Sequence, residues 1–397
     1  MDRRHFLATA AAGAATVIVK AAAPARSLIL ITEADAARMR AAMTPERTAL
    51  FGKMAKDALA AGPWSVTYHR PSGVPVSAGP NDYVSEGPYW WPDPKNPNGP
   101  YSRKDGQRNP DRFLGNRNDL GAICSSVLGL GLGAYFLKNT QCAPQANKVL
   151  EVWFLDPKTR MTPHLEHGQL TRGHDDGRGT GLIDTVSYIH LVQGIALMEL
   201  AGGLDAGVAR GVREWFGAFV KWMTTSKKGL AEKTSGNNHE TWWTAQVAAY
   251  SLFTGDAANQ QMCWNHYRNY LVPTEIQPDG SCPREEARTA SLSYSSMNLD
   301  AFATICRLAQ THGVELWKFR SSKGIGVEKS FTYLLPYVLQ PETWKKEQMS
   351  KYGAGGYVFP GLAGIGLPSK ELLAGYLKLP RADSAWVQFC DLLVRST

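Results

Sequence analysis

Two polar segments of the chain hold side chains that together can remove a weakly acidic proton beside a carboxylate. The segment TSGNNHETWW contains Asn238 and His239, and the later segment PREEARTASLSY contains Arg288 and Tyr294, six residues apart. Amide, imidazole and guanidinium groups can all donate hydrogen bonds to a carboxylate. A phenol can transfer a proton. This set of side chains predicts a site that acts on a uronic acid polymer.

Cleavage of a 4-linked uronate by β-elimination begins with removal of the C5 proton, which is barely acidic while the adjacent carboxylate keeps its charge. Donors that neutralise the carboxylate stabilise the enolate-like intermediate. A free tyrosine has a pKa of about 10, and a guanidinium such as that of Arg288 favours the phenolate and lowers this pKa. Tyr294 can then take the C5 proton and return it to O4, which suits a sugar whose C5–H and C4–O lie on one face.

Both motifs also have a structural interpretation. Asn237 or Asn238 is a natural N-cap for the helix that the apolar pattern of HETWWTAQVAAYSLF predicts, and an arginine six residues from a tyrosine is common. A helix N-terminus also favours an anionic group, because its free N–H groups carry partial positive charge. Asn238 and His239 are therefore expected to point toward such a group.

The elements that position these residues are predicted to be helices. Apolar residues recur with helical period in stretches separated by loops rich in Gly, Pro, Asn and Asp, and alternating strand patterns are scarce. Thr32 is a plausible N-cap of the first helix. This pattern favours an all-α fold, an incomplete α/α toroid of helix pairs, over an up-down bundle. We expect helices near residues 33–44, 47–61, 118–138, 181–201, 206–225, 239–254, 257–270, 297–312, 326–339 and 384–395.

Residues 64–118 differ from the helical remainder because they are polar and rich in proline and aromatic residues. A loop of this length inside a compact domain is usually functional or disordered, and aromatic side chains argue against disorder. We expect a lid or cleft wall in which Tyr83, Trp90 and Trp91 contact the substrate. The alternative is that these aromatic side chains fix the loop to the helical core.

Three segments of the sequence resemble one known family. NNHETWW, PDGSCPREEARTASLSY and DYVSEGPYWWPDP…PYSRKDGQRNP are similar, in order and spacing, to the alginate lyase superfamily domain, over roughly residues 80–310. That group includes the mannuronate-specific alginate lyases of polysaccharide lyase family 5 and the glucuronan and alginate lyases of family 38. The interval from Arg288 to Tyr294 and the PYWWPDP loop look closer to family 38.

The resemblance implies an α/α toroid and a role for each matching residue. Asn238 and His239 would handle the substrate carboxylate, with support from Arg288. Tyr294 would be the catalytic acid and base, and Trp242 would stack on a sugar ring. Departures from the family pattern place Glu285 and Glu286 close to Arg288, where either acid could pair with the guanidinium and weaken its effect on Tyr294.

Two other functions remain open at this point. A glycoside hydrolase on the same scaffold needs two carboxylates about 5–10 Å apart, for which Glu240, Glu285 and Glu286 are candidates. A sugar-binding protein without turnover fits the aromatic residues but leaves the arginine and tyrosine without a purpose. Within the lyase hypothesis, mannuronate and glucuronate share their configuration at C4 and C5, so the four catalytic candidates do not distinguish these two substrates.

The segment HLEHGQLTRGHDDGRGTGLID, residues 164–184, concentrates polar side chains in a different way. Its histidines lack the HExxH spacing of a catalytic zinc helix, and its glycines indicate a loop. GRGTGLID has neither a preceding strand nor GxGxxG, so nucleotide binding is unsupported. We therefore expect no metal and no cofactor. The segment is predicted to form the cleft floor, with Arg178 available to a substrate carboxylate.

The first residues indicate export. Arg3 and Arg4, followed by a short apolar stretch and small residues, are typical of a twin-arginine signal peptide over residues 1–25. Residues 26–397 are then one domain, periplasmic or secreted. A formal net charge of +8 without long runs of Lys or Arg disfavours nucleic acid as a partner and favours a small-unit polyanion, here a uronan.

The mature chain offers no stretch of 18 uninterrupted apolar residues, so we expect no membrane-spanning segment after signal cleavage. Six cysteines enter an oxidising compartment, which makes one to three disulfides possible. The sequence does not choose among their pairings.

Overall fold

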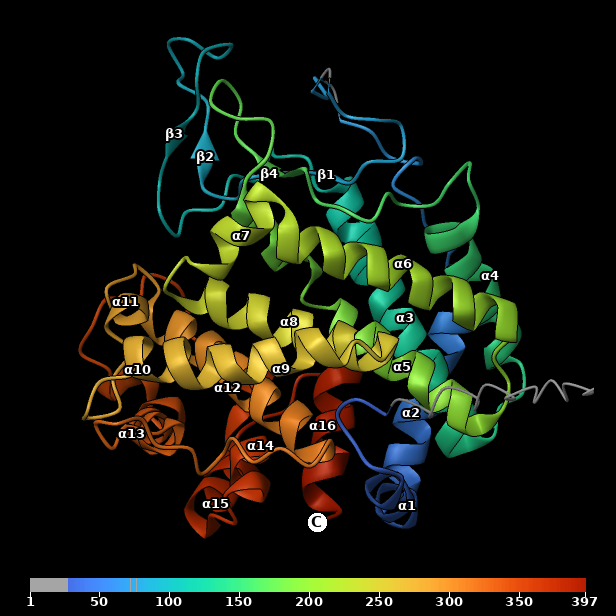
Figure 1. Ribbon diagram of the computed structural model, residues 1–397, viewed down its shortest axis with the longest axis vertical. Coiled ribbons are helices and arrows are strands. Elements are labelled where there is room, and N and C mark those ends of the chain that lie inside the picture. Colours follow the sequence, from blue (N-terminus) through green and yellow to red (C-terminus); the bar gives the residue numbers. More distant parts are fainter. Residues whose placement is uncertain (1–27, 72, 76) are drawn as a thin grey trace, which may run out of the picture.

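Helix α8 (Asn238–Thr254) is the element around which the other helices are arranged. Every residue from Asn238 to Phe253 is buried except His239, and a helix that is buried on all sides belongs to the core of a large domain. The computed structural model describes residues 28–397 except 72 and 76 (Figure 1). Around α8 lie the three helices α6 (Ala206–Thr225), α9 (Ala257–His266) and α12 (Ser291–Thr311).

The inner helices follow one another around a ring. Contacts lead from α3 to α5, α8, α12 and α14, and α16 closes the ring because it packs against both α14 and α3 (Figure 1). The prediction of an α/α toroid is confirmed. The remaining inner helices are α3 (Gly115–Leu137), α5 (Tyr188–Ala201), α14 (Phe359–Gly366) and α16 (Ala385–Arg395).

An outer set of helices covers the ring. Helices α2 and α4 pack on α3, α6 and α9 pack on α8, α13 packs on α12, and α15 packs on α14. These outer helices and the short ones are α1 (Glu33–Ala41), α2 (Pro45–Leu59), α4 (Cys142–Leu150), α7 (Lys227–Lys233), α10 (Val272–Glu275), α11 (Pro283–Glu286), α13 (Val327–Leu339) and α15 (Lys370–Lys378). Short segments of other helix types are η1 (Glu151–Leu155), η2 (Gly179–Thr185), η3 (Tyr267–Leu271), η4 (Pro341–Thr343) and η5 (Ala354–Gly356).

Each of the ten predicted helices is present, with differences at its ends. Helix α6 has the predicted bounds, and Thr32 caps α1 through a reciprocal hydrogen-bond pair with Asp35. Helix α12 begins at Ser291, before the predicted residue 297, because the polar side chains of its first turns hid the helical pattern. Tyr294 is therefore a helical residue and not part of a loop.

Four short strands hold the polar segments above the ring. Strand β1 (Val84–Glu86) pairs in parallel with β4 (His167–Leu170). Strand β2 (Trp90–Trp91) pairs with β3 (Ser102–Arg103) in an antiparallel arm at the upper left of Figure 1. The predicted lid thus contains an arm of two strands, β2 and β3. Strand β4, from the polar segment 164–184, pairs with β1, which precedes this arm in the chain.

Helices α3 and α5 cross so closely that only glycine fits at the contact. A Cβ atom on Gly131 would lie 2.5 Å from the carbonyl oxygen of Gly194, and one on Gly194 would lie 2.6 Å from that of Val127. Segments 115–137 and 179–201 are long and apolar enough to cross a membrane by composition, yet 78% of each is buried inside the protein. Their apolar character is that of core helices.

The cysteine prediction is wrong for the described chain, which includes all six. Each is a free and buried thiol, and burial raises the pKa of Cys142 to about 11 and that of Cys124 to about 12. They act as small apolar core residues. The predicted signal peptide, residues 1–25, lies outside the described residues.

Glu275 is a buried carboxyl group that joins three elements. It is 5% exposed, and it accepts hydrogen bonds from Thr241 of α8 at 2.9 Å and from Asn298 of α12 at 3.0 Å. Burial raises the pKa of Glu275 to about 8, and the nearby Glu285 and Glu240 contribute in the same direction. The folded protein therefore keeps a proton on Glu275 at neutral pH.

Replacement of Glu275 by glutamine should make stability less dependent on pH. In the wild type the raised pKa favours the folded state below about pH 4.5, and this advantage is lost as pH rises toward 8. Relative to the wild type, Glu275→Gln should gain roughly 3–4 kcal/mol in free energy of unfolding between pH 5 and pH 8. Urea denaturation at the two pH values measures this change, and a constant difference would contradict the buried, protonated state.

Candidate active site

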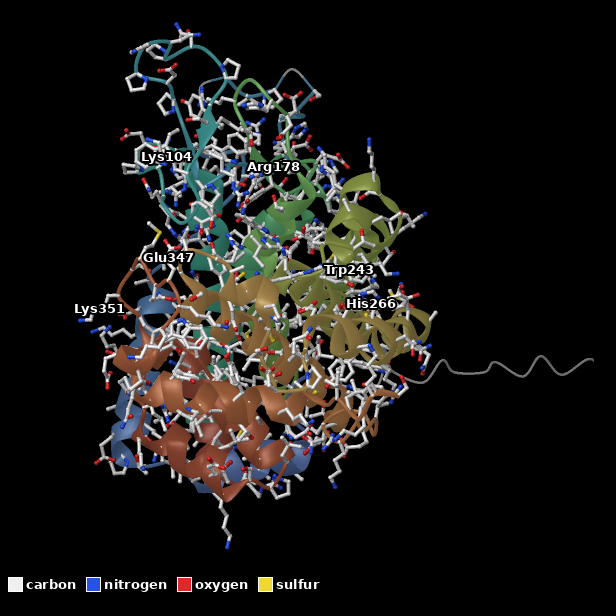
Figure 2. All side chains as sticks on the ribbon, turned by 90° about the vertical axis from the view of Figure 1, so that its left-hand side faces the viewer. Lys104, Arg178, Trp243, His266, Glu347 and Lys351 are labelled. Atoms are coloured by element: carbon white, nitrogen blue, oxygen red, sulfur yellow. The ribbon has the colours of Figure 1, made fainter. Side chains whose placement is uncertain are left out.

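A cavity of about 370 Å³ lies where the β2–β3 arm, α3, η2, and the N-terminal ends of α8 and α12 meet. Figure 2 shows Arg178, one of the residues that line this cavity, in the upper part of the molecule near Lys104. The cavity brings together three of the predicted catalytic residues, His239, Arg288 and Tyr294, although α8 and α12 are separate elements. Other lining residues used below are Glu86, Tyr89, Trp90, Arg103, Arg108, Arg112, Arg117, Arg178, Asp184 and Asn237.

The turn before α8 decides which asparagine faces the cavity. Gly236 has a φ of +73°, and a Cβ there would collide with Arg284, so the turn requires glycine. Asn237 is the N-cap, and its side chain accepts the N–H of His239 at 3.0 Å. Asn237 lines the cavity.

Asn238 lies beneath the cavity, which corrects the expectation that its side chain points toward the substrate. It is fully buried, and its N–H and its Nδ2 donate to the two oxygens of Glu285 at 2.6 and 2.7 Å. The acidic group at the N-terminus of α8 is therefore the protein's own Glu285, whose pKa is raised by burial. Because Asn237 is the N-cap, Asn237 faces the cavity, whereas Asn238, the next residue, is buried.

His239 is the one residue in the first turns of α8 that is not buried, and it lines the cavity. Its Nδ1 lies 2.5 Å from Oε1 of Glu232, a residue of α7 that is 2% exposed. The imidazole is thus held from below by a buried carboxylate. The sequence analysis missed Glu232 because α7 is too short to give a periodic apolar pattern.

Arg288 and Tyr294 are in direct contact. The guanidinium carbon of Arg288 lies 3.9 Å from the centre of the Tyr294 ring, which is a cation–π geometry. The acid that pairs with Arg288 is Asp105 of the arm, at 3.0 Å, and neither Glu285 nor Glu286, the two predicted candidates. Glu285 is committed to Asn238 as described above, and Glu286 pairs with Lys346.

Tyr89, on the arm, is the neighbour of Tyr294 that the sequence analysis did not assign to the site. The two hydroxyl oxygens lie 2.5 Å apart. Burial raises the pKa of Tyr294, the hydrogen bond with Tyr89 raises it further, and the charge of Arg288 opposes both effects. The prediction that Arg288 lowers the pKa of Tyr294 below its ordinary value is therefore wrong. With Tyr89 in contact, the Tyr294 phenol carries its proton at neutral pH.

The cavity wall is strongly cationic. Six arginines line it, against the two acidic residues Glu86 and Asp184. Asp184 accepts hydrogen bonds from Tyr83 and Ser85 and lies 3.3 Å from Arg117. Burial lowers the pKa of Arg112 and of Arg178, yet a guanidinium stays charged in proteins. Excess positive charge in a recessed cavity concentrates anions. The arginines are Arg103, Arg108, Arg112, Arg117, Arg178 and Arg288.

The predicted aromatic contacts divide between the cavity and the rest of the fold. Trp90 lines the cavity, and the Arg178 guanidinium carbon lies 5.6 Å from its ring centre. Trp91 packs outside against Lys104 and donates its Nε1–H to the carbonyl oxygen of Gln107. For Tyr83 and Trp242 the predicted contact with a sugar is wrong. Tyr83 is fully buried and Trp242, 9% exposed, belongs to the core, so neither offers a ring to a sugar.

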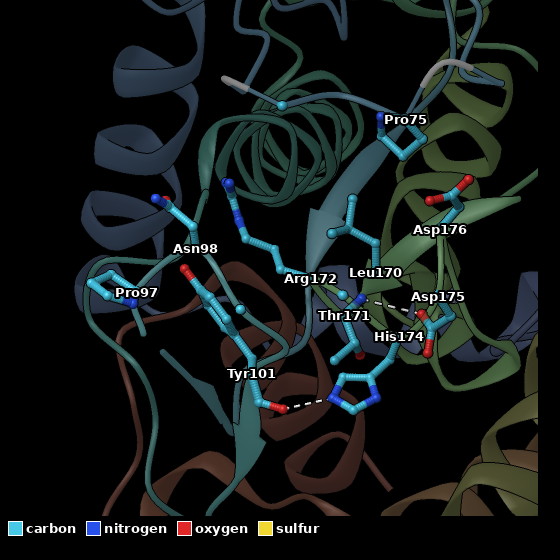
Figure 3. A pocket seen from close by; sticks show the side chains of 13 residues that line it. Pro75, Pro97, Asn98, Tyr101, Leu170, Thr171, Arg172, His174, Asp175 and Asp176 are labelled. Carbon is cyan, nitrogen blue, oxygen red and sulfur yellow. Dashed lines mark hydrogen bonds between the residues drawn. The ribbon is translucent and has the colours of Figure 1, made fainter. Parts of the chain in front are cut away.

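A second cavity, of about 810 Å³, is lined by residues 97–99 and 101 and by residues 170–176 (Figure 3). It includes part of the polar segment 164–184, where the Nε2 atom of His174 lies 2.7 Å from the carbonyl oxygen of Tyr101 and the carboxylate of Asp175 accepts the N–H of Thr171. This larger cavity is lined by Tyr101, Arg172 and His174, but its arginine pairs with Glu86 and its histidine contacts the carbonyl oxygen of Tyr101. The predicted residues His239, Arg288 and Tyr294 all line the smaller cavity. We therefore place the active site in the smaller cavity.

Comparisons with known proteins agree with this assignment. The family model described as alginate lyase matches residues 68–344. An alginate lyase structure from Bacteroides ovatus shares 32% identity and a TM-score of 0.85, covering 92% of this chain and 98% of that chain. No curated protein matches the sequence.

Two further structures show the same fold at lower identity. A variant of alginate lyase A1-III in complex with a tetrasaccharide shares 15% identity and a TM-score of 0.62, covering 93% of this chain and 97% of that chain. Alginate lyase A1-III from Sphingomonas species A1 shares 17% identity and a TM-score of 0.55, with coverage of 86% and 95%. Since the family model covers most of the chain and a relative is this similar along its whole length, the protein belongs to the alginate lyase family and is a polysaccharide lyase.

Proposed function

We propose that the protein cleaves β-1,4-linked uronans by β-elimination, with polymannuronate, as in alginate, or glucuronan as substrate. The observation that carries this proposal is the cavity in which the hydroxyl of Tyr294, the guanidinium of Arg288 and the imidazole of His239 meet under a cationic wall. The alginate lyases among the similar structures support alginate. Glucuronan stays a candidate because its C4 and C5 configuration matches that of mannuronate.

Neutralisation of the substrate carboxylate falls to His239 and Arg288. Both line the cavity, and both can donate to a carboxylate as its charge spreads into the enolate-like intermediate. Asn237, which lines the same wall, takes the place proposed from the sequence for Asn238. Asn238 acts indirectly, because its hydrogen bonds to Glu285 hold the turn that presents Asn237 and His239.

Proton transfer falls to Tyr294. Its phenolate is favoured by Arg288 at 3.9 Å, which opposes the burial and the Tyr89 hydrogen bond that raise the pKa of Tyr294. After Tyr294 takes the C5 proton, the same hydroxyl returns it to the leaving O4 on the same face of the ring. Trp90 and Arg178 form the part of the wall that can hold a sugar ring and its carboxylate.

The three carboxylates proposed for a glycoside hydrolase are all engaged by other residues. Glu240 is buried against His266 at 2.8 Å, Glu285 is committed to Asn238, and Glu286 pairs with Lys346. None of these three candidates lines the described cavity. Membership of a polysaccharide lyase family likewise disfavours a binding protein without turnover.

We also propose that the enzyme works outside the cytoplasm. The support is the pair Arg3 and Arg4 before a short apolar stretch. A polymeric substrate that is too large to enter a cell agrees with this location.

An absorbance assay on four polymers tests the proposed reaction. The mature protein should produce absorbance near 235 nm from polymannuronate or glucuronan, because β-elimination creates a C4–C5 double bond conjugated to the carboxylate. Polyguluronate, whose C5 configuration differs, should react much more slowly, and hyaluronan is the fourth polymer. Activity should survive a chelator. New reducing ends without this absorbance would contradict the lyase mechanism.

Removal of single hydroxyl groups tests the proton-transfer step. Tyr294→Phe should lower kcat by about 100- to 10,000-fold, the usual contribution of a general acid or base. Tyr89→Phe should change kcat far less, because it removes only one hydrogen bond that positions the phenol. Initial rates at 235 nm measure both effects, and full activity of Tyr294→Phe would exclude Tyr294 as the acid and base.

The two asparagines should respond differently to replacement. Asn238→Ala should lower the free energy of unfolding by about 2–4 kcal/mol, because Glu285 loses the side-chain donor of its two donors in a buried site, and adding Glu285→Gln should recover part of that loss. Asn237→Ser keeps an N-cap oxygen and should mainly raise KM. Denaturant titration and steady-state kinetics separate the two effects. A raised KM with unchanged stability in Asn238→Ala would reverse the assignment.

A further inference from the structure

The pair formed by Glu232 and His239 lies directly under the active-site cavity. Glu232 comes from α7, which Ser226 caps and which packs on η2 and α8. Its carboxylate is 2% exposed and accepts from Nδ1 of His239 at 2.5 Å. A buried carboxylate at this distance gives a strong, charge-assisted hydrogen bond. The bond fixes the orientation of the ring, because the other side of His239 borders the cavity.

This hydrogen bond determines what His239 can offer to a substrate. An ionised carboxylate only accepts hydrogen bonds, so Nδ1 must carry the hydrogen. In the neutral imidazole the second nitrogen, Nε2, then has a lone pair and no hydrogen. A neutral His239 therefore cannot donate to the substrate carboxylate. Only the imidazolium form presents an Nε2–H donor to the cavity.

The charges around the ring come from several elements. Arg178 near η2, Arg288 after α11 and Arg117 of α3 are cations of the cavity, while Asp184 of η2 and Tyr294 of α12 are its titratable neighbours. Three guanidinium groups disfavour another cation. Glu232, the buried acid in direct contact with the ring, opposes this effect.

We propose that Glu232 is a positioning residue that keeps His239 in the imidazolium form, with Nε2–H directed at the substrate carboxylate. This inference deepens the proposed function and rests on it for the identity of the carboxylate. It divides the work of the site between two residues. His239 acts as a charged donor and never as the base, which leaves proton abstraction to Tyr294.

A second glutamate–histidine pair on the same helix provides a matched control. Glu240 Oε1 lies 2.8 Å from Nε2 of His266, and both side chains are buried. His266 stacks on Tyr270, and in Figure 2 it lies near Trp243, well below Arg178 in that view. Glu240→Gln thus makes the same chemical change one residue from His239, without altering a residue that lines the cavity.

Nitrogen-15 NMR of the imidazole tests the pair without any substrate. Spectra of protein with labelled histidine, recorded across pH with His239→Gln as the assignment control, should show His239 protonated on Nδ1 alone at high pH and on both nitrogens at lower pH. In Glu232→Gln the charged form should disappear at a pH lower by about one unit or more, because a neutral amide replaces the carboxylate. A neutral wild-type ring protonated on Nε2 would overturn the inference.

The pH dependence of kcat/KM tests the consequence for turnover, since this ratio reports protonation in the free enzyme. Glu232→Gln keeps an acceptor oxygen for the ring, so activity near pH 6 should stay within about threefold of the wild type, and the alkaline limb should move to lower pH. Glu232→Ala should lose activity at every pH. Glu240→Gln should follow the wild-type profile.

The outcomes separate the inference from the proposed function. A Glu232→Gln profile identical to the wild type would show that the carboxylate charge has no role. A shift of the acidic limb alone would make His239 a base, which also contradicts the inference. Absence of unsaturated products from the wild type would refute the proposed function, while the NMR experiment would still decide the state of the pair.

Discussion

Buried carboxylates beneath the turn before α8 are the interaction on which the rest of the site depends. Glu285 accepts both donors of Asn238, and Glu232 accepts from His239. Burial of an acid is costly unless its hydrogen bonds are satisfied, so these contacts have little freedom to change. They tie α7 and α11 to the start of α8. Because α11 leads directly into Arg288 and α12, the same contacts set the distance between the imidazole and the phenol.

The site therefore has two layers, a buried layer of acidic residues and a cavity wall rich in arginine. Below the cavity lie acids that hold the turn, and above it lie the guanidinium groups that line its wall. Asp105 is the acid of the upper layer, and its bonds to Arg288 and Thr289 connect the arm to α12. Through Tyr89 and Asp105, the arm contacts both members of the Arg288–Tyr294 pair. The arm is thus part of the site and not only its cover.

Much of the fold could be predicted because long helices leave a periodic apolar pattern. The bounds of α6 and the cap at Thr32 follow from local rules, whereas α7 and α11 are held by tertiary contacts and carry no such pattern. The motifs around His239, Arg288 and Tyr294 identified the right neighbourhood. They did not reveal Asp105 and Tyr89, which lie 183 and 205 residues from their partners. They also did not reveal Glu232, because the short helix α7 gives no periodic pattern.

Burial explains the remaining errors. Tyr83, Trp90 and Trp242 are alike as residue types, and nothing local distinguishes a ring in the core from a ring at the cavity. The N-cap register, which decides between Asn237 and Asn238, depends on a single residue of the turn. The pKa of Tyr294 was misjudged for a related reason. The spacing of the two residues predicts that Arg288 lowers the pKa of Tyr294, but it does not predict the burial that raises this pKa by more.

The six arginines of the cavity wall affect how long a chain fragment stays bound. A uronan carries one negative charge per sugar, so a long fragment contacts several guanidinium groups at once, and a short fragment contacts few. Each lost pair weakens retention, and salt weakens every exposed pair further. Residence time should therefore fall steeply with fragment length, so that short products leave by themselves while the polymer remains in place for another cut.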